Sequence, residues 1–231
     1  MNYFLSLKHK KNKTSLALYL IGFCLLFTNS ASAIDLQCNL ADNSQINPEV
    51  IATMAEAADK GYLYLIDTNT SNIRFQVNHF PFSRVEGHFS DFQGGMTLPT
   101  DTVHSRQALF LIKVDSITTG DKDIDDYVKS SVFFDATHYP DIIFISTGFE
   151  WVNKSTARLY GDLTLKGMTK AIVFTAHIDN TDSHNIKNEP KMVMIASAEI
   201  QRSEFGMHEM QVLVSDTVRF DLQIEASRIG I

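Results

Sequence analysis

Apolar and polar side chains alternate along much of the chain from residue 62 onward. Between residues 72 and 79 every second position belongs to one set, which consists of Ile73, Phe75, Val77 and His79. The same period of two runs over residues 218–225, where Val, Phe, Leu and Ile alternate with Arg, Asp, Gln and Glu. Because successive side chains of a β-strand point to opposite faces, this pattern predicts strands with one buried face.

Six further strands are predicted between these two segments. They lie near residues 87–98 (with an interruption at Gly94-Gly95), 108–115, 142–149, 156–165, 171–178 and 192–201. The short connection at residues 166–170 indicates a hairpin. Many consecutive strands with one apolar face favour an antiparallel sheet that closes on itself or doubles over, because closure removes exposed strand edges. We therefore expect an all-β fold, a barrel of about eight strands that is filled by side chains or holds one small ligand.

Two segments do not follow the strand pattern. Residues 49–60 follow Asn47-Pro48 and precede Gly61, an arrangement that predicts a short N-terminal helix. Residues 120–140 carry several aspartates before Phe133-Phe134 and Tyr139-Pro140. The charged residues favour water, whereas the two phenylalanines need an apolar environment. We expect a lid-like crossover, in which Phe133 and Phe134 either gate a ligand or plug a closed core.

The N-terminus has the pattern of a secretory signal peptide. A segment with four lysines precedes an apolar run at residues 16–27, and Ala31-Ser32-Ala33 supplies the small residues that cleavage requires. We expect export and cleavage after Ala33. The remaining chain then divides into an N-terminal arm, residues 34–61, and one β domain, residues 62–231.

Removal of the leader changes the charge and the cysteine content. The chain has 20 Lys and Arg and 27 Asp and Glu; the leader holds four of the lysines and none of the acids, which leaves a net charge of −11. This charge disfavours nucleic acid and anionic membrane surfaces as partners. Cys38 becomes the single cysteine of the exported part, so it is either a reduced thiol on the arm or the link of a homodimer.

Motifs for catalysis or metal binding are missing from the sequence. The acidic run from Asp121 to Asp126 lacks the glycine and glutamate of a calcium loop. His79 and His88 fall on neighbouring predicted strands, but no spacing typical of a zinc site occurs. We therefore expect no metal and no cofactor. The alternatives are an enzyme that uses His79 or Arg202 on an apolar substrate, and a stress-related interaction module with a filled core.

The inward-facing set predicts an apolar lumen. The chain has 16 phenylalanines against one tryptophan, which suits a ligand with a long hydrocarbon body. Arg202 is the one basic residue expected to point inward. It either fastens a loop through an ion pair with Asp216 or Glu204, or anchors the anionic head of a ligand. The candidate lining residues are Phe75, Val77, His79, Phe89, Phe110, Ile112, Phe133, Phe134, Phe144, Phe174, Arg202 and Phe220.

An ordered set of short motifs resembles the YceI-like family. The set includes Tyr64-Leu65-Ile66-Asp67, Val85-Glu86-Gly87-His88-Phe89, Ser116-Ile117-Thr118-Thr119-Gly120, Phe133-Phe134-Asp135, Gly161-Asp162-Leu163-Thr164-Leu165 and Gln201-Arg202-Ser203-Glu204-Phe205-Gly206. Each motif is weak alone, but their order across residues 62–226 is specific. Two features depart from the family: Ile124 stands where an arginine is common, and the arm before residue 61 is longer than expected.

The resemblance implies a fold, a location and a ligand. The fold is a lipocalin-like antiparallel barrel, and the location is the periplasm. The ligand is a polyisoprenoid or similar amphiphilic lipid, held in an elongated hydrophobic pore. The resemblance thus implies a non-enzymatic carrier or store, with peripheral or no membrane contact.

Overall fold

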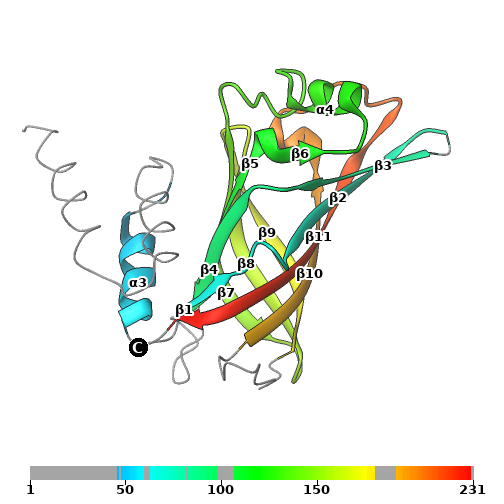
Figure 1. The fold of residues 1–231 in the computed structure, drawn as a ribbon. Helices are drawn as coiled ribbons and strands as arrows, with labels where there is room; N and C mark the ends of the chain where they lie inside the picture. The colour runs from blue at the N-terminus through cyan, green and yellow to red at the C-terminus, as the bar shows by residue number, and fades with distance from the viewer. Residues whose placement is uncertain are drawn as a thin grey trace, which may run out of the picture.

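The predicted strands are present and pair with their neighbours in one antiparallel sheet (Figure 1). The structure, a computed structural model, describes residues 46, 48–59, 63–81, 83–97, 107–179 and 191–229. The strands run in the order β1-β4-β5-β7-β8-β9-β10-β11-β2-β3-β6, and a further pairing of β1 with β11 closes a barrel. Their bounds are Leu63–Ile66 (β1), Asn72–His79 (β2), Ser83–Phe89 (β3), Phe92–Thr97 (β4), Ala108–Lys113 (β5), Ile117–Thr118 (β6), Asp141–Trp151 (β7), Thr156–Leu165 (β8), Met168–Asp179 (β9), Lys191–Gln201 (β10) and Val214–Ile229 (β11).

These strands form eight spans that run up and down the barrel. β1 and β2 both pair antiparallel with β11, so they lie one after the other along it and form a single broken span. β3 and β4 form a second broken span, and β5 and β6 a third, with the short helix η2 (Val114–Ser116) between them. The prediction of an antiparallel barrel of about eight strands is confirmed.

The interruption predicted at Gly94-Gly95 is wrong, because both glycines lie inside β4. A Cβ on Gly94 would lie 2.4 Å from the carbonyl oxygen of Leu109 on β5, so glycine is needed here for close approach of two strands. The span breaks instead between β3 and β4, at Ser90 and Asp91, where Asp91 accepts a hydrogen bond from the amide of Lys113. Glycine is favoured both where two strands approach each other closely and in turns, so the sequence alone does not distinguish these two structures.

The hairpin between β8 and β9 is tighter than predicted. Its loop consists of Lys166 and Gly167, with φ angles of 49° and 71°. Two consecutive left-handed residues match the twist of the flanking strands, so β9 begins at Met168 and not near residue 171.

The predicted N-terminal helix is α3, Pro48–Asp59, and it lies beside the barrel (Figure 1). Met54 packs with residues of β1, β5 and β7 in a small cluster outside the main core. β5 is therefore buried on both faces, which explains its unbroken apolar run from Ala108 to Ile112. The predicted cleavage site, Asn47, Gly61 and Cys38 lie outside the described residues.

The crossover predicted at residues 120–140 contains α4, Lys122–Lys129, and sits at one end of the barrel with the short helix η3, Arg202–Phe205 (Figure 1). The lid-like arrangement expected from its composition is thus present. Within the described residues, neither helix is long and apolar enough to cross a membrane, and the same holds for α3.

Candidate ligand-binding site

A cavity of about 230 Å³ lies inside the barrel at the end that α4 covers; we call it the first cavity. β2 and β11 supply much of its wall, in register: Val77 pairs with Val218, and Phe75 pairs with Phe220. The alternation that predicted an inward face on these strands is therefore correct. The predicted lining residues found here are Phe75, Val77, His79, Phe133, Phe134, Arg202 and Phe220.

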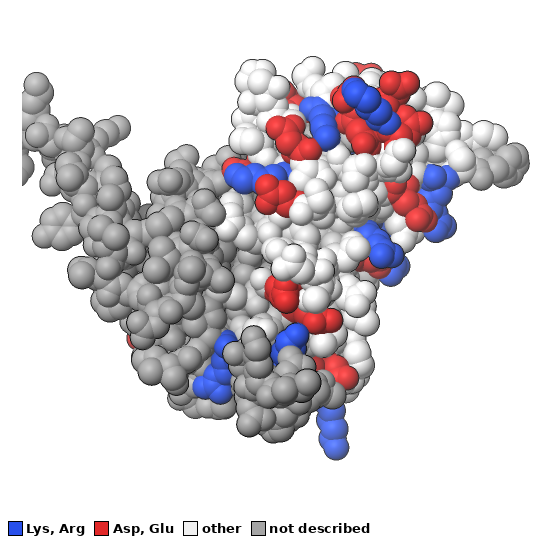
Figure 2. Space-filling model, viewed as in Figure 1, with Lys and Arg blue, Asp and Glu red and all other residues white. Residues whose placement is uncertain are grey.

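The lid helix α4 is amphipathic and turns its apolar side to the first cavity. Ile124, Tyr127 and Val128 line the cavity, whereas Asp123 and Asp126 are exposed. Figure 2 shows acidic and basic side chains gathered over this end of the molecule. Ile124, Tyr127 and Val128 are separated by three, one and four residues, which is typical of one face of a helix. The sequence therefore contains a signal for these three lining residues. Ile124 contributes to the apolar underside of the lid.

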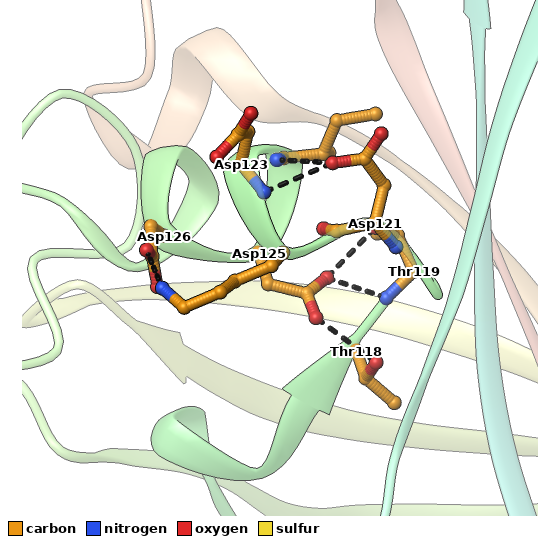
Figure 3. Close-up of polar contacts among 8 residues, drawn as sticks. Thr118, Thr119, Asp121, Asp123, Asp125 and Asp126 are labelled. Atoms are coloured by element: carbon orange, nitrogen blue, oxygen red, sulfur yellow. Dashed lines mark hydrogen bonds and ion pairs between the residues drawn. The ribbon is translucent and has the colours of Figure 1, made fainter.

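Asp125 ties α4 to the barrel wall (Figure 3). Its carboxylate accepts hydrogen bonds from the amide of Thr119 at 2.6 Å, from the hydroxyl of Thr119 at 2.7 Å and from the hydroxyl of Thr118 at 3.0 Å. Burial raises the pKa of Asp125, but these hydrogen bonds outweigh it, and the pKa lies below its ordinary value. Asp121 caps the same helix by accepting from the amides of Asp123 and Ile124.

Acid should therefore loosen the lid before it unfolds the barrel. A carboxyl group whose folded pKa is lowered stabilises the fold above its unfolded pKa, and this contribution is lost as the pH falls through the folded pKa. We expect α4 to lose protection from hydrogen exchange at a higher pH than the central strands do. Asp125→Asn should remove most of this pH dependence and about 1–2 kcal/mol of local stability. Asp123→Asn, which alters an exposed carboxylate of α4, serves as the control, and equal behaviour of the two variants would contradict the assignment.

Arg202 fastens the loop that completes the mouth of the first cavity. Its side chain is buried, with 2% of its surface exposed. Nε donates to the carbonyl oxygen of Ser215 at 3.0 Å, Nη1 to that of Met207 at 2.6 Å and Nη2 to that of Val214 at 3.0 Å. Its guanidinium carbon also lies 5.7 Å from the centre of the Phe133 ring. The expected role as a loop fastener is thus supported by geometry.

The partners predicted for that fastening role are wrong. Asp216 accepts hydrogen bonds from the amide and hydroxyl of Ser203, at 2.8 and 2.6 Å, so it holds the start of η3 and not the guanidinium. Burial lowers the pKa of Arg202, and the negative charge of Asp216 partly opposes this effect. Carbonyl oxygens satisfy the arginine because Met207, after η3, and the first two residues of β11, Val214 and Ser215, turn their backbone carbonyl groups toward it.

A glycine opposite Phe75 keeps part of the first cavity open. Gly87 on β3 is the register partner of Phe75, and a Cβ at Gly87 would lie 2.4 Å from Cε1 of that ring. The ring can therefore lie flat against β3 at a site where any other residue would push it away. Phe89, two residues further along, packs between Phe75 and Phe134, with ring centres 5.9 and 6.3 Å apart. Phe89 is thus buried in the core between two lining rings, and it is not one of the residues that line the first cavity.

The other predicted lining residues lie deeper in the barrel. Phe110, Ile112, Phe144 and Phe174 line a second cavity of about 30 Å³, and Phe220 borders it as well. The ring of Phe144 meets those of Phe174 and Phe110 edge-on, at 5.3 and 6.3 Å between centres. A third cavity of about 20 Å³ follows. Side chains fill most of this part of the lumen, which differs from the elongated open pore that the family resemblance implied.

Sequence reasoning also missed the methionines of the mouth. Met207 and Met210 follow η3 and line the first cavity together with Val214. They lie in a loop, where neither period of two nor helical spacing applies. Unbranched methionine side chains adapt to irregular spaces, which suits the rim of a ligand pocket.

His79 and Arg202, the residues named for the enzyme alternative, both line the first cavity, but metal-binding side chains are not grouped in the part of the chain that the structure describes. Among the residues that the structure describes, no three His, Cys, Asp or Glu side chains are grouped to hold a metal ion. His79 pairs in register with Ser83, and His88 with Arg74, so the two histidines lie at opposite ends of the β2–β3 ladder. The Nδ1 atom of His79 lies 3.1 Å from the hydroxyl of Ser83.

A family model described as the YceI-like domain matches residues 64–226. The chain belongs to the YceI-like family. A relative from Pseudomonas savastanoi pv. phaseolicola, named only as a UPF0312 protein, is 32% identical over 127 residues, which are 54% of this chain and 64% of the relative. The matched part thus spans less than two thirds of that relative.

Two solved structures show the same fold. The crystal structure of Burkholderia cenocepacia BcnA matches 69% of this chain and 98% of its own, with 21% identity and a TM-score of 0.62. A polyisoprenoid binding domain from Saccharophagus degradans, implicated in plant cell wall breakdown, matches 71% of this chain and 98% of its own, with 14% identity and a TM-score of 0.55. The lipocalin-like barrel of the YceI-like family is therefore the fold of this protein.

Proposed function

We propose that this protein binds a polyisoprenoid or similar amphiphilic lipid in the first cavity, and that it carries or stores this lipid after export to the periplasm. The observation that carries the proposal is the first cavity itself: about 230 Å³ of space between apolar strand faces and the apolar underside of α4. The shared fold of a polyisoprenoid binding domain supports the choice of ligand.

Burial of the tail supplies the binding energy in this proposal. Each methylene removed from water contributes about 0.8 kcal/mol, so a short hydrocarbon tail needs few polar contacts. All three side-chain nitrogens of Arg202 already donate to backbone carbonyl oxygens of residues 207–215. In this proposal Arg202 therefore stabilises the backbone at the entrance of the first cavity and does not anchor the head group of the lipid. His79 contacts Ser83. The proposal therefore assigns both residues structural roles and no catalytic step.

The test is to identify what the protein carries. Protein purified from the periplasmic fraction is extracted with organic solvent and the extract is analysed by mass spectrometry, with a prenyl lipid as the expected product. Val77→Phe places a ring in the first cavity, and we expect it to reduce the recovered lipid at least tenfold.

Val173→Phe provides a matched control, because Val173 is 43% exposed on the outer face of β9. It should carry as much lipid as the unaltered protein. The proposal would be contradicted if repeated preparations yielded no apolar compound, or if both variants yielded equal amounts of lipid.

A further inference from the structure

The lumen is divided into compartments that follow one another along the barrel. On β11, Val218 lines the first cavity, Phe220 lines the first and the second, and Leu222 lines the second. On β10, Ile200 lines the first cavity, Ala196 the second, and Met194 both the second and the third. Alternate residues of one strand rise about 7 Å per step, so the three cavities form one interrupted line.

Phe220 lies between the first cavity and the second cavity. Of the residues that the structure describes, it is the only one that borders both the first and the second cavity. Its neighbours in register are Phe75 on β2 and Ala198 on β10. The ring is therefore held between an aromatic wall and a small residue, and 7% of its surface is exposed.

The sizes of the cavities set the length of tail that fits. An enclosed cavity of about 150 Å³ accommodates benzene, which has six carbons. In proportion, the first cavity at about 230 Å³ holds about nine carbons, or roughly two isoprene units. The second and third cavities, at about 30 and 20 Å³, have room for roughly two or three waters and roughly one or two waters, respectively, since one water needs roughly 10–15 Å³.

We infer that Phe220 limits how deeply a tail enters, so that this protein selects amphiphiles with a single short prenyl tail of about two isoprene units. This inference rests on the proposed function and specifies its ligand class. A longer polyisoprenoid gains nothing from its additional units, because these stay outside the first cavity.

The experiment compares prenyl alcohols of one, two, three and four isoprene units. Affinity is measured by displacement of an environment-sensitive apolar dye from the full chain. Inside the cavity, each added carbon should raise affinity about fourfold. We expect this rise to stop at about two units.

Phe220→Ala should move that limit. Removal of the ring joins the first and second cavities and frees the space of roughly one benzene, or about one more isoprene unit. The rise in affinity should then continue to the alcohol of about three units.

Phe174→Ala is the matched control. Phe174 is also 7% exposed and lines the second cavity but not the first, so its removal opens a similar void behind an intact Phe220. In this variant the rise in affinity should stop at the same number of isoprene units as in the unaltered protein. If the alanine variants do not fold, the pair Phe220→Leu and Phe174→Leu should give the same order with smaller shifts.

The outcomes separate the two proposals. Binding that strengthens through all four alcohols in the unaltered protein overturns the inference alone, as does an equal shift in both variants. Failure of every alcohol to bind overturns the proposed function and the inference with it.

Discussion

Arg202→Met should lower the free energy of unfolding by about 3–5 kcal/mol, the largest effect that we expect from one side chain. Methionine keeps much of the length and volume but donates no hydrogen bond, so the carbonyl oxygens of Met207, Val214 and Ser215 lose their partner. Hydrogen bonds to a charged group contribute about 1.5–3 kcal/mol each, and relief of the buried charge offsets part of their loss.

Denaturant unfolding and ligand affinity both report on this change. The loop from Met207 to Ser215 completes the mouth of the first cavity, so affinity for a prenyl alcohol should fall together with stability. Arg219→Met is the control: Arg219 lies on the outer face of β11 with its side chain 48% exposed, and its pair with Asp221 should contribute less than about 1 kcal/mol. An unfolding free energy of Arg202→Met close to that of Arg219→Met would refute the fastening role.

Gly161→Ala should lower stability by about 3 kcal/mol, whereas Gly87→Ala should mainly abolish ligand binding. At both sites a Cβ would lie 2.4 Å from a phenylalanine ring: that of Phe144 for Gly161, and that of Phe75 for Gly87. Phe144 is confined by Phe110 and Phe174, and the second cavity beside it, at about 30 Å³, is too small to take the displaced ring. Overpacking of a filled core is strongly destabilising.

Phe75 differs because it borders the first cavity, and its ring can turn into that space. We expect Gly87→Ala to lower the free energy of unfolding by about 1–2 kcal/mol. This residual loss arises because a Cβ would lie 2.9 Å from the carbonyl oxygen of Thr118. The displaced ring then occupies the volume of the tail, and prenyl alcohol affinity should fall at least tenfold. Thermal unfolding and the dye assay, run on both variants, separate the two effects. Equal stability losses with unchanged affinity in both would contradict the cavity assignment.

The period of two was sufficient to predict the barrel and the part of the cavity lining that β2 and β11 supply. It placed Phe75, Val77 and Phe220 on inward faces, because a slip of one residue would have turned charged neighbours such as Arg74 into the core. It did not show which inward residues border open space. Phe89 and Phe110 give the same signal, but Phe89 packs between two rings that line the first cavity and Phe110 borders the small second cavity.

The mouth of the cavity was less predictable for a physical reason. Its residues lie in short helices and loops, where side-chain direction depends on contacts between segments far apart in the sequence. The partners of Arg202 illustrate this point: nearby carboxylates suggested an ion pair, but the backbone of residues 207–215 satisfies the guanidinium. A backbone carbonyl is available at every residue, so no sequence pattern distinguishes the ones that are used.

The position of β11 has a consequence for how the protein matures. This strand pairs with β10 on one side and with both β1 and β2 on the other, and its contact with β1 joins Leu63 to Ile229. A contact between residues so far apart in the sequence forms slowly, because the loop that it closes is long. The apolar interior of the barrel therefore stays exposed until β11 pairs with β1 and β2, and a ligand can be enclosed only after this step.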